Sequence, residues 1–551
     1  MSPFLRLLLL IATFPATLLS AASPGAFPAS AKAEAIGGHF QKLTEWLNGR
    51  ISVSPGGLTE ERMQKVLHDP HFASALAQHR FISKTGVQHL TSFAMASEDQ
   101  QQFLSWLLGH TEALERFLEG ATPIGKNNRE ADRWTIDPAA LRIWCRIFTA
   151  DPESRSGLYL RLAMATGLNP PGTGNQGAGQ AATPDSPLSR FQHFKSAHRA
   201  GALFPSFDTL SVWELRQIVS SNASNADLAW GRDAINTWRP DLRINELVVN
   251  STSEVWRRNS PIPFENSFRN VLAGGGKCGP RSSWAIFICQ AFGIPAVGVR
   301  QPGHVCATYK SAYPDVQPQP GQAWKVVYGR GWHVSKACGL PGEEFMTEMA
   351  LRGDEKKFFH LERHRWLSAA LSSPERVAAI KSLANRVSTP GPRGIPLQKR
   401  AEKSPVTPGK AAPENPPRVP EGVIHIEAED FAKAAGIAIH ECFLGGKQLY
   451  NAKYAPGWGA APRISYKIDI PAGGTYQLTL HAAVANLEQF VHVTLDGGAR
   501  YSLPVPNSHG LWSDTPPLEL RLPSGTQTLT LTRPAAQRGL ALRYLQLRRT
   551  P

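Results

Sequence analysis

Two side chains near the middle of the chain could together attack an acyl carbon. Cys278 stands in the run Gly274-Gly-Gly-Lys-Cys-Gly-Pro-Arg-Ser282, and His304 follows 26 residues later. A cysteine is a nucleophile as its thiolate, and both a helix N-terminus and a nearby imidazole favour that form. The pair therefore predicts nucleophilic catalysis, in which Cys278 attacks and His304 transfers the proton.

A helix must present the cysteine. Pro280 suits a first helical turn, where its missing N–H costs nothing. Apolar side chains then recur at helical spacing until Gly293 offers a stop; they are Trp284, Phe287, Ile288 and Phe292. The segment predicts a helix that begins at Cys278.

Short apolar runs after this helix predict strands. Residues 294–299 form one run and residues 304–309 form the next, with His304 at its start. Residues 324–328 and 332–335 flank Gly329-Arg-Gly331, so we expect them to pair as a hairpin.

This order resembles the transglutaminase-like superfamily of papain-like cysteine enzymes. The resemblance is carried by Cys278-Gly, by Ala291-Phe-Gly-Ile-Pro295-Ala and by the strand that opens at His304. It implies an α+β domain that acts on an amide bond of a peptide or protein substrate, as a peptidase, amidase or acyl transferase. No cofactor is implied for catalysis. Cys278 would be the nucleophile and His304 the base.

The third member that the family implies is an acid a few residues after a Gly-Trp pair. Gly331-Trp332 is present, but His333, Val334, Ser335 and Lys336 follow it without a carboxylate. Asp315 is the acid in the connecting loop and the candidate third member. A catalytic dyad therefore stays open, as does a non-catalytic envelope or polysaccharide-binding protein with a degenerate domain. In that case Cys278 and His304 would be packing residues.

A metal is a further alternative at this strand. His304 and Cys306 alternate to the same face and could both ligate an ion, although packing is the simpler account of Cys306. The sequence has no Cys-x-x-Cys pair and no His-rich tract. It therefore does not favour zinc.

The last part of the chain alternates apolar and polar residues with period two. Turn signals separate the alternating segments, which predicts a β-sandwich; the segments are 464–470, 476–480, 491–495, 518–522 and 528–531.

This region resembles the galactose-binding-like jelly rolls, in particular carbohydrate-binding modules of families 6 and 35. The carriers are Ile426-Glu-Ala-Glu-Asp-Phe431, Leu495-Asp-Gly-Gly and Leu522-Pro-Ser-Gly. The resemblance implies a polysaccharide or cell-envelope glycan as partner, because flat aromatic faces stack on pyranose rings. The implied binding residues are Tyr450, Trp458, Asn486 and Trp512. It also implies calcium at Glu427 and Glu429, but Arg543 stands where the family places an acid.

The N-terminus reads as a secretory signal peptide over residues 1–22, with Arg6 ahead of an apolar run and Ser20-Ala21-Ala22 at the exit. We therefore expect a secreted, periplasmic or cell-envelope protein without a membrane span. Six cysteines in 551 residues are too few for a disulfide-built fold. The net charge of +15 favours anionic surfaces, and no motif points to nucleic acid.

The sequence therefore predicts a multidomain chain. An α-helical N-terminal region over 38–165 and a flexible insert over 166–188 precede the transglutaminase-like domain at 190–385. A Pro-rich basic linker follows at 386–420, and the β-sandwich jelly roll occupies 421–549.

Overall fold

The computed structural model describes most of the chain from residue 33 onward. The described ranges are 33–51, 59–125, 132–173, 184–238, 268–274, 278–301, 303–310, 324–326, 334–335, 339–371, 373–374, 376–378, 380–381, 422–441, 447–453, 463–485, 488–496, 498–533 and 538–551. Contacts divide the chain into two compact units, residues 1–115 with 356–389 and residues 116–355 with 390–551. The expected domain boundaries stay a prediction, and the last of the division points, between Thr389 and Pro390, falls inside the expected linker.

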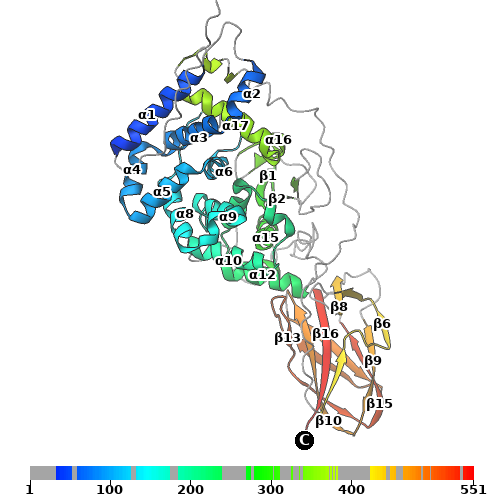
Figure 1. Cartoon of the computed structure of the whole chain (residues 1–551). Coiled ribbons are helices and arrows are strands. Elements are labelled where there is room, and N and C mark those ends of the chain that lie inside the picture. Colours follow the sequence, from blue (N-terminus) through cyan, green and yellow to red (C-terminus); the bar gives the residue numbers. More distant parts are fainter. Residues whose placement is uncertain are drawn as a thin grey trace, which may run out of the picture. The chain divides into compact units, whose positions relative to one another are not determined.

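The first unit is helical, as predicted (Figure 1). Side-chain caps explain where several helices begin: Thr59 accepts from Arg62 N, Asp69 from His71 N, and Ser97 from Gln100 N. The helices are α1 (Ala33–Arg50), α2 (Glu60–His68), α3 (Pro70–Thr85), α4 (Val87–Met95), α5 (Glu98–Gly109), the first part of α6 (Thr111–Ala121), and α17 (Glu355–Ala370).

Helix α17 returns from far along the sequence to pack with the first helices. Arg363 forms two bonds with Glu115, at 2.7 and 2.9 Å, and donates to Leu67 O at 3.0 Å. Asn48 Nδ2 donates to Ala370 O at 3.0 Å. These bonds join α17 to α1, α2 and α6.

The second unit contains a further set of helices and two β regions. Its helices are α8 (Pro138–Ala150), α9 (Gly157–Leu168), α10 (Pro187–Arg199), α11 (Val212–Val219), α12 (Asn225–Trp238), α14 (Phe268–Gly274), α15 (Cys278–Ala291) and α16 (Gly342–Gly353), with 3₁₀ turns at Pro152–Arg155 and Pro205–Thr209. A capping box, in which Ser211 and Glu214 bond each other's backbone, begins α11.

A four-stranded sheet in the order β3-β2-β1-β4 lies beside α15. Its strands are β1 (Ala296–Gln301), β2 (His304–Lys310), β3 (Trp324–Val326) and β4 (Val334–Ser335). The predicted hairpin is wrong. β3 pairs with β2 and β4 pairs with β1, so the two strands lie at opposite edges of the sheet.

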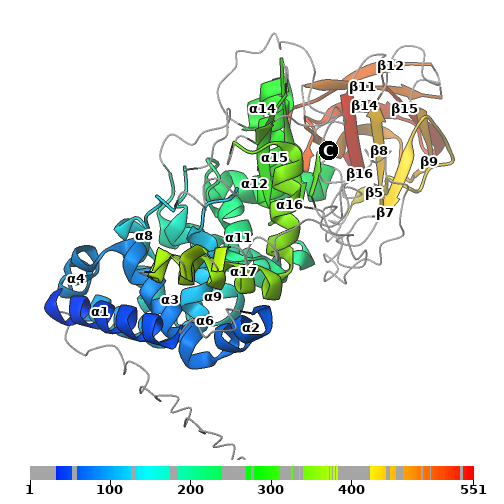
Figure 2. The same ribbon diagram turned by 90° about the horizontal axis from the view of Figure 1, so that it is seen from above.

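Helix α15 is the predicted cysteine helix, and it begins at Cys278 as expected. Every residue from Ser282 to Ala291 is buried, against β1, β2, α11, α12 and α14. The Phe268 and Phe287 rings stack at 3.9 Å. A Cβ on Gly231 would lie 2.8 Å from the Phe287 ring, so this glycine lets α12 approach closely (Figure 2).

Residues 422–551 form the predicted β-sandwich. One sheet has the order β13-β10-β16-β8-β7, with β14 on β10 and β5 on β16, and the other has the order β12-β11-β15-β9-β6. Alternate residues are buried along β10, and Leu478, Leu480, Leu545 and Val493 lie in the core between the sheets. The strands are β5 (Val423–Glu427), β6 (Lys433–Ala435), β7 (Ala438–Glu441), β8 (Lys447–Lys453), β9 (Arg463–Ile470), β10 (Gly474–Val484), β11 (Gln489–Leu495), β12 (Arg500–Val505), β13 (Ser513–Asp514), β14 (Leu518–Leu522), β15 (Gly525–Thr532) and β16 (Arg538–Arg549).

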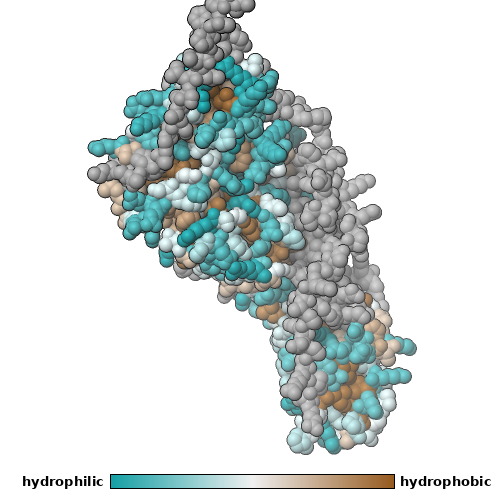
Figure 3. All heavy atoms as spheres, in the orientation of Figure 1, coloured by the Kyte–Doolittle hydropathy of each residue, from teal (hydrophilic) through white to brown (hydrophobic). Residues whose placement is uncertain are grey.

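The coloured surface in Figure 3 is mainly hydrophilic. Among the described residues the large hydrophobic side chains that are exposed are Met95, Phe490 and Leu511. No helix within the described ranges has the length and apolar character needed to cross a bilayer.

We predict that His193 makes the second unit sensitive to acid. Arg232 Nη2 donates to His193 Nε2 at 3.2 Å, and burial together with Arg232 and Arg190 holds the pKa of His193 at about 3. Below pH 6.5 the unfolded chain protonates this residue while the folded chain does not. The free energy of unfolding therefore falls by up to about 1.4 kcal/mol per pH unit, down to about pH 3.

Urea unfolding followed by tryptophan fluorescence at pH 7 and pH 5 measures this effect. His193→Gln keeps an acceptor for Arg232 but does not titrate, so the variant should lose less stability than the parent between the two pH values. An equal loss in both proteins would contradict the assignment.

Candidate functional site

Cys278 lies in the first turn of α15 and is partly exposed. The other described cysteines, Cys145, Cys289 and Cys306, are buried, and burial raises the pKa of the Cys289 thiol. Within the described part of the chain, Cys278 is therefore the cysteine that solvent reaches. Its position at the N-terminal end of a helix is the one that the sequence predicted.

The start of β2 is tied to the first turns of α15. Ser282 stands one helical turn after Cys278, and its hydroxyl donates to the carbonyl oxygen of Val305 at 2.9 Å. Val305 follows His304 directly. The structure thus places the helix end that carries Cys278 and the strand end that carries His304 on the same side of the helix–sheet layer.

Strand alternation decides which face His304 occupies. His304 pairs with Gln301 across β1, and Cys306 and Thr308 share its face. Thr308 donates to Lys325 O on β3 at 2.8 Å, which fixes the neighbouring strand. Val305 points to the opposite face. His304 itself is partly buried at the end of the sheet.

The third member of a triad falls outside the described residues. This holds for Asp315 and also for the Gly331-Trp332-His333 segment. Asp315 therefore stays a prediction, and the dyad stays an alternative.

The predicted carbohydrate-binding residues divide in the same way. Trp458 and Asn486 lie outside the described residues. The backbone of Tyr450 lies on β8, where it pairs with Ala438 and Ala541. Trp512 is described and partly exposed.

Trp512 stands at the end of a ladder of stacked rings that crosses one sheet of the sandwich. Its ring stacks on His481 at 5.4 Å, His481 stacks on Tyr544 at 4.5 Å with an interplanar angle of 3°, and Tyr544 lies 4.6 Å from His425. Cross-strand register makes this possible, because His481 pairs with Tyr544 between β10 and β16. The ladder lies on the face that does not point into the core, since Leu480 and Leu545 are buried.

Carboxylates lie at both sides of the ladder. Asp514 bonds His481 Nδ1 at 2.7 Å and its side chain is 62 % exposed. Glu427 bonds His425 Nε2 at 3.0 Å and is 46 % exposed. Burial raises the pKa of Tyr544, so its phenol stays a hydrogen-bond donor at neutral pH. The face can thus both stack on a ring and bond hydroxyl groups.

Glu427 and Glu429 were the predicted calcium ligands. In the structure Glu427 bonds His425 Nε2 at 3.0 Å. Neither glutamate belongs to a described group of three or more close His, Cys, Asp or Glu donors. Calcium binding there stays a prediction.

Sequence analysis missed a different group of donors in the first unit. Glu60, His360 and His364 hold their ligand atoms within 4.8 Å of one another. The available signal was His360-x-x-x-His364, since histidines four apart share one helix face. Glu60 could not be added to it, because it stands 300 positions away.

The solved structures that resemble this protein align with about a quarter of the chain. The C-terminal family 6 carbohydrate-binding module of a marine laminarinase from Zobellia galactanivorans is 18 % identical, with a TM-score of 0.20, over 23 % of this chain and 99 % of that one. A carbohydrate-binding module from a Cellvibrio mixtus lichenase, in complex with cellotriose, is 21 % identical, with a TM-score of 0.20, over 23 % of this chain and 98 % of the module. A family 35 module from Clostridium thermocellum is 16 % identical, with a TM-score of 0.21, over 23 % and 98 %. No protein-family model and no curated protein matches the chain.

We predict that iodoacetamide labels Cys278 at least about tenfold faster than Cys145, Cys289 and Cys306. The buried thiols can react only after local opening, whereas Cys278 is already partly exposed. Peptide mass spectrometry of the native protein measures each rate. Cys278→Ser should remove the fast-labelled peptide that contains this position, and equal labelling of the four described thiols would contradict the prediction.

Proposed function

We propose that the C-terminal sandwich binds a glycan on the sheet face that carries the ring ladder, with Trp512 as its stacking residue. The observation that carries this proposal is the ladder itself, in which His481 and Tyr544 hold the Trp512 ring in place. Among the described residues Trp512 has one ring neighbour, so its second face is not stacked on another described ring. A preorganised aromatic face loses little entropy when it binds a pyranose ring.

Polar groups supply the rest of such a site. Asp514 uses one carboxylate oxygen for His481, and its exposed side chain can accept further hydrogen bonds from sugar hydroxyl groups. The carboxylate therefore orients a sugar that Trp512 holds by stacking.

We predict that Trp512→Ala weakens glycan binding by at least about tenfold, equivalent to about 1.4 kcal/mol. Affinity electrophoresis of the full chain in gels containing β-glucan, xylan, mannan or polygalacturonate measures retardation. Phe490→Ala is the matched control, because Phe490 is 39 % exposed on the other sheet. Retardation that is absent with every polysaccharide, or that both variants retain, would remove the proposal.

A second function is favoured by the link between α15 and β2. We propose that Cys278 and His304 transfer or hydrolyse an acyl group at an amide bond. The sulfur would bond the acyl carbon while His304 takes the thiol proton and gives it to the departing amine. Water or a second amine would then attack the thioester and release the cysteine. The Ser282 bond to Val305 supports this proposal, because it holds the two chain ends together.

The combined proposal is an exported cysteine enzyme that a glycan-binding module holds on its polysaccharide. If the thiol pair is inactive, the sandwich alone gives the alternative of a non-catalytic envelope or polysaccharide-binding protein. Secretion itself rests on the signal-like N-terminus, which lies outside the described residues.

The geometry of the pair can be tested without knowing the substrate. We predict that a cysteine at position 304 forms a disulfide with Cys278 under mild oxidation, since Ser282 bonds Val305 O and so ties the two chain ends, while a disulfide needs Cα atoms within about 7 Å. Val305→Cys is the matched control, because Val305 alternates to the other face of β2. Disulfide mapping by mass spectrometry should find the crosslink in His304→Cys alone. Its absence there, or equal crosslinking in both variants, would contradict the placement of the two chain ends on which this proposal rests.

A further inference from the structure

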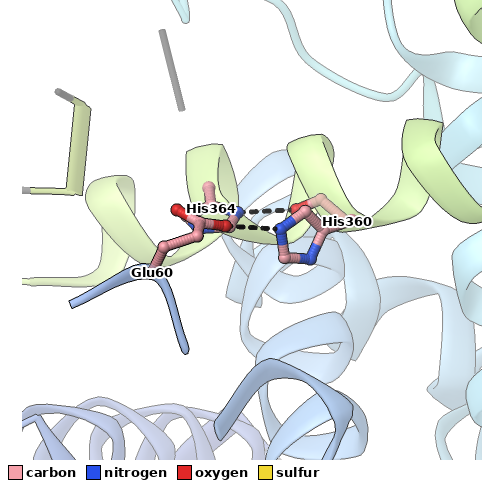
Figure 4. A group of neighbouring side chains, drawn as sticks. All are labelled: Glu60, His360 and His364. Atoms are coloured by element: carbon pink, nitrogen blue, oxygen red, sulfur yellow. Dashed lines mark hydrogen bonds and ion pairs between the residues drawn. The ribbon is translucent and has the colours of Figure 1, made fainter. Parts of the chain in front are cut away.

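A cluster of metal-type donors lies in the first unit, apart from the residues discussed above as functional. His360 and His364 stand four residues apart on α17, and Glu60 begins α2 (Figure 4). Glu60 Oε1 lies 3.1 Å from His360 Nε2, and the two imidazole rings lie 4.5 Å apart at 82°. All three side chains point toward one another.

The hydrogen bonding of His364 leaves one of its ring nitrogens without a partner. His364 Nδ1 lies 2.8 Å from the His360 carbonyl oxygen, which can only accept, so Nδ1 carries the proton and Nε2 a lone pair. His364 is fully buried, and its Nε2 has no hydrogen-bond partner. A buried acceptor without a partner is destabilising, because its water contacts are lost and not replaced.

The hydrogen bond from His364 Nδ1 to the His360 carbonyl oxygen also fixes how the His364 ring is oriented. Metal-ligating histidines usually donate their other ring N–H to a carbonyl or carboxylate, which fixes the ring orientation and the tautomer. His364 has this arrangement without a ligand on the far nitrogen. His360 adds a further buried ring nitrogen without a partner, Nδ1. A simple ion pair between Glu60 and His360 explains neither orphaned nitrogen.

We propose that Glu60, His360 and His364 bind a divalent first-row transition-metal ion, with Zn²⁺ as the best-fitting ion. Two imidazoles and one carboxylate are a donor set that zinc accepts, with a fourth position left for water. Tetrahedral zinc holds its ligand atoms about 3.4 Å apart, so donors within 4.8 Å need only small side-chain rotations. Solvent reaches the site from the Glu60 side, where that side chain is 38 % exposed and His360 is 11 % exposed.

The ion would join the first turn of α2 to α17. Arg363, on the same helix as both histidines, is engaged by Glu115 and by Leu67 O. Its charge is thus partly neutralised beside the site. The bound ion would act as a structural clamp on the first unit.

Cobalt titration of the untagged full chain tests this site. The protein carries Cys278→Ser, so that the partly exposed thiol among the described cysteines does not contribute, and is first stripped with chelator and dialysed. We expect one Co²⁺ per chain, with d–d absorption bands of a low-coordinate site that Zn²⁺ displaces. Zn²⁺ at a hundredfold excess over its Kd should raise the Tm by about 5 °C or more.

Variants separate this site from adventitious binding. Glu60→Gln changes a partly exposed side chain and should weaken binding at least tenfold, and His364→Gln should abolish it. His71→Gln, which removes an exposed histidine on α3, is the control and should bind as the parent does. Circular dichroism confirms folding, and Glu60→Gln remains informative if His364→Gln unfolds. No saturable binding at 100 μM metal, or equal binding in parent and Glu60→Gln, would overturn the proposal.

Discussion

The fold around Cys278 depends on the burial of α15 on every side. Every residue of this helix from Ser282 to Ala291 is buried. A helix in such a position must satisfy its polar groups internally. Ser282 donates to Val305 O, Gln290 donates to Gln217 O, and Arg232 donates to the C-terminal carbonyl of Ala291. Each bond also attaches a different neighbour, β2, α11 or α12, so the polar groups of the helix define its surroundings.

This enclosure determines where chemistry can occur. The C-terminal end of α15 is sealed by Arg232 and by Gly293, whose φ of +76° turns the chain sharply into the next strand. The N-terminal end remains partly open, and Cys278 is the residue found there. A thiol elsewhere on the helix, such as Cys289, is fully buried. The helix therefore offers one accessible nucleophile, at the end where its N–H groups favour an anion.

Local signals were enough to predict the elements but not their partners. The start of α15 at Cys278 and the strands of the sandwich follow from helix punctuation and from period-two alternation, which are properties of neighbouring residues. The prediction of a hairpin over residues 324–335 was wrong, because the tertiary fold decides which strands pair. β3 pairs with β2, and β4 pairs with β1. The cluster of Glu60, His360 and His364 also depends on the tertiary fold, because α17 and α2 must pack together to bring these residues close. The sequence predicted His304 as a strand residue. The bond between Ser282 on α15 and Val305, the neighbour of His304, could be seen only in the structure.

The ring ladder limits how the proposed glycan site could hold a sugar. Its rings stack on one another at 4.5 to 5.4 Å, so His481 and Tyr544 have their faces covered and offer edges to solvent. In the proposed site, Trp512 at the end of the ladder is therefore the described ring that we assign to stacking on a pyranose ring. The remaining contacts must be hydrogen bonds, for which the exposed Asp514 and Glu427 carboxylates are placed at the two sides. A ligand that fits this face has one apolar sugar face and hydroxyl groups along the rest of its length, because only such a chain matches one stacking surface followed by polar acceptors.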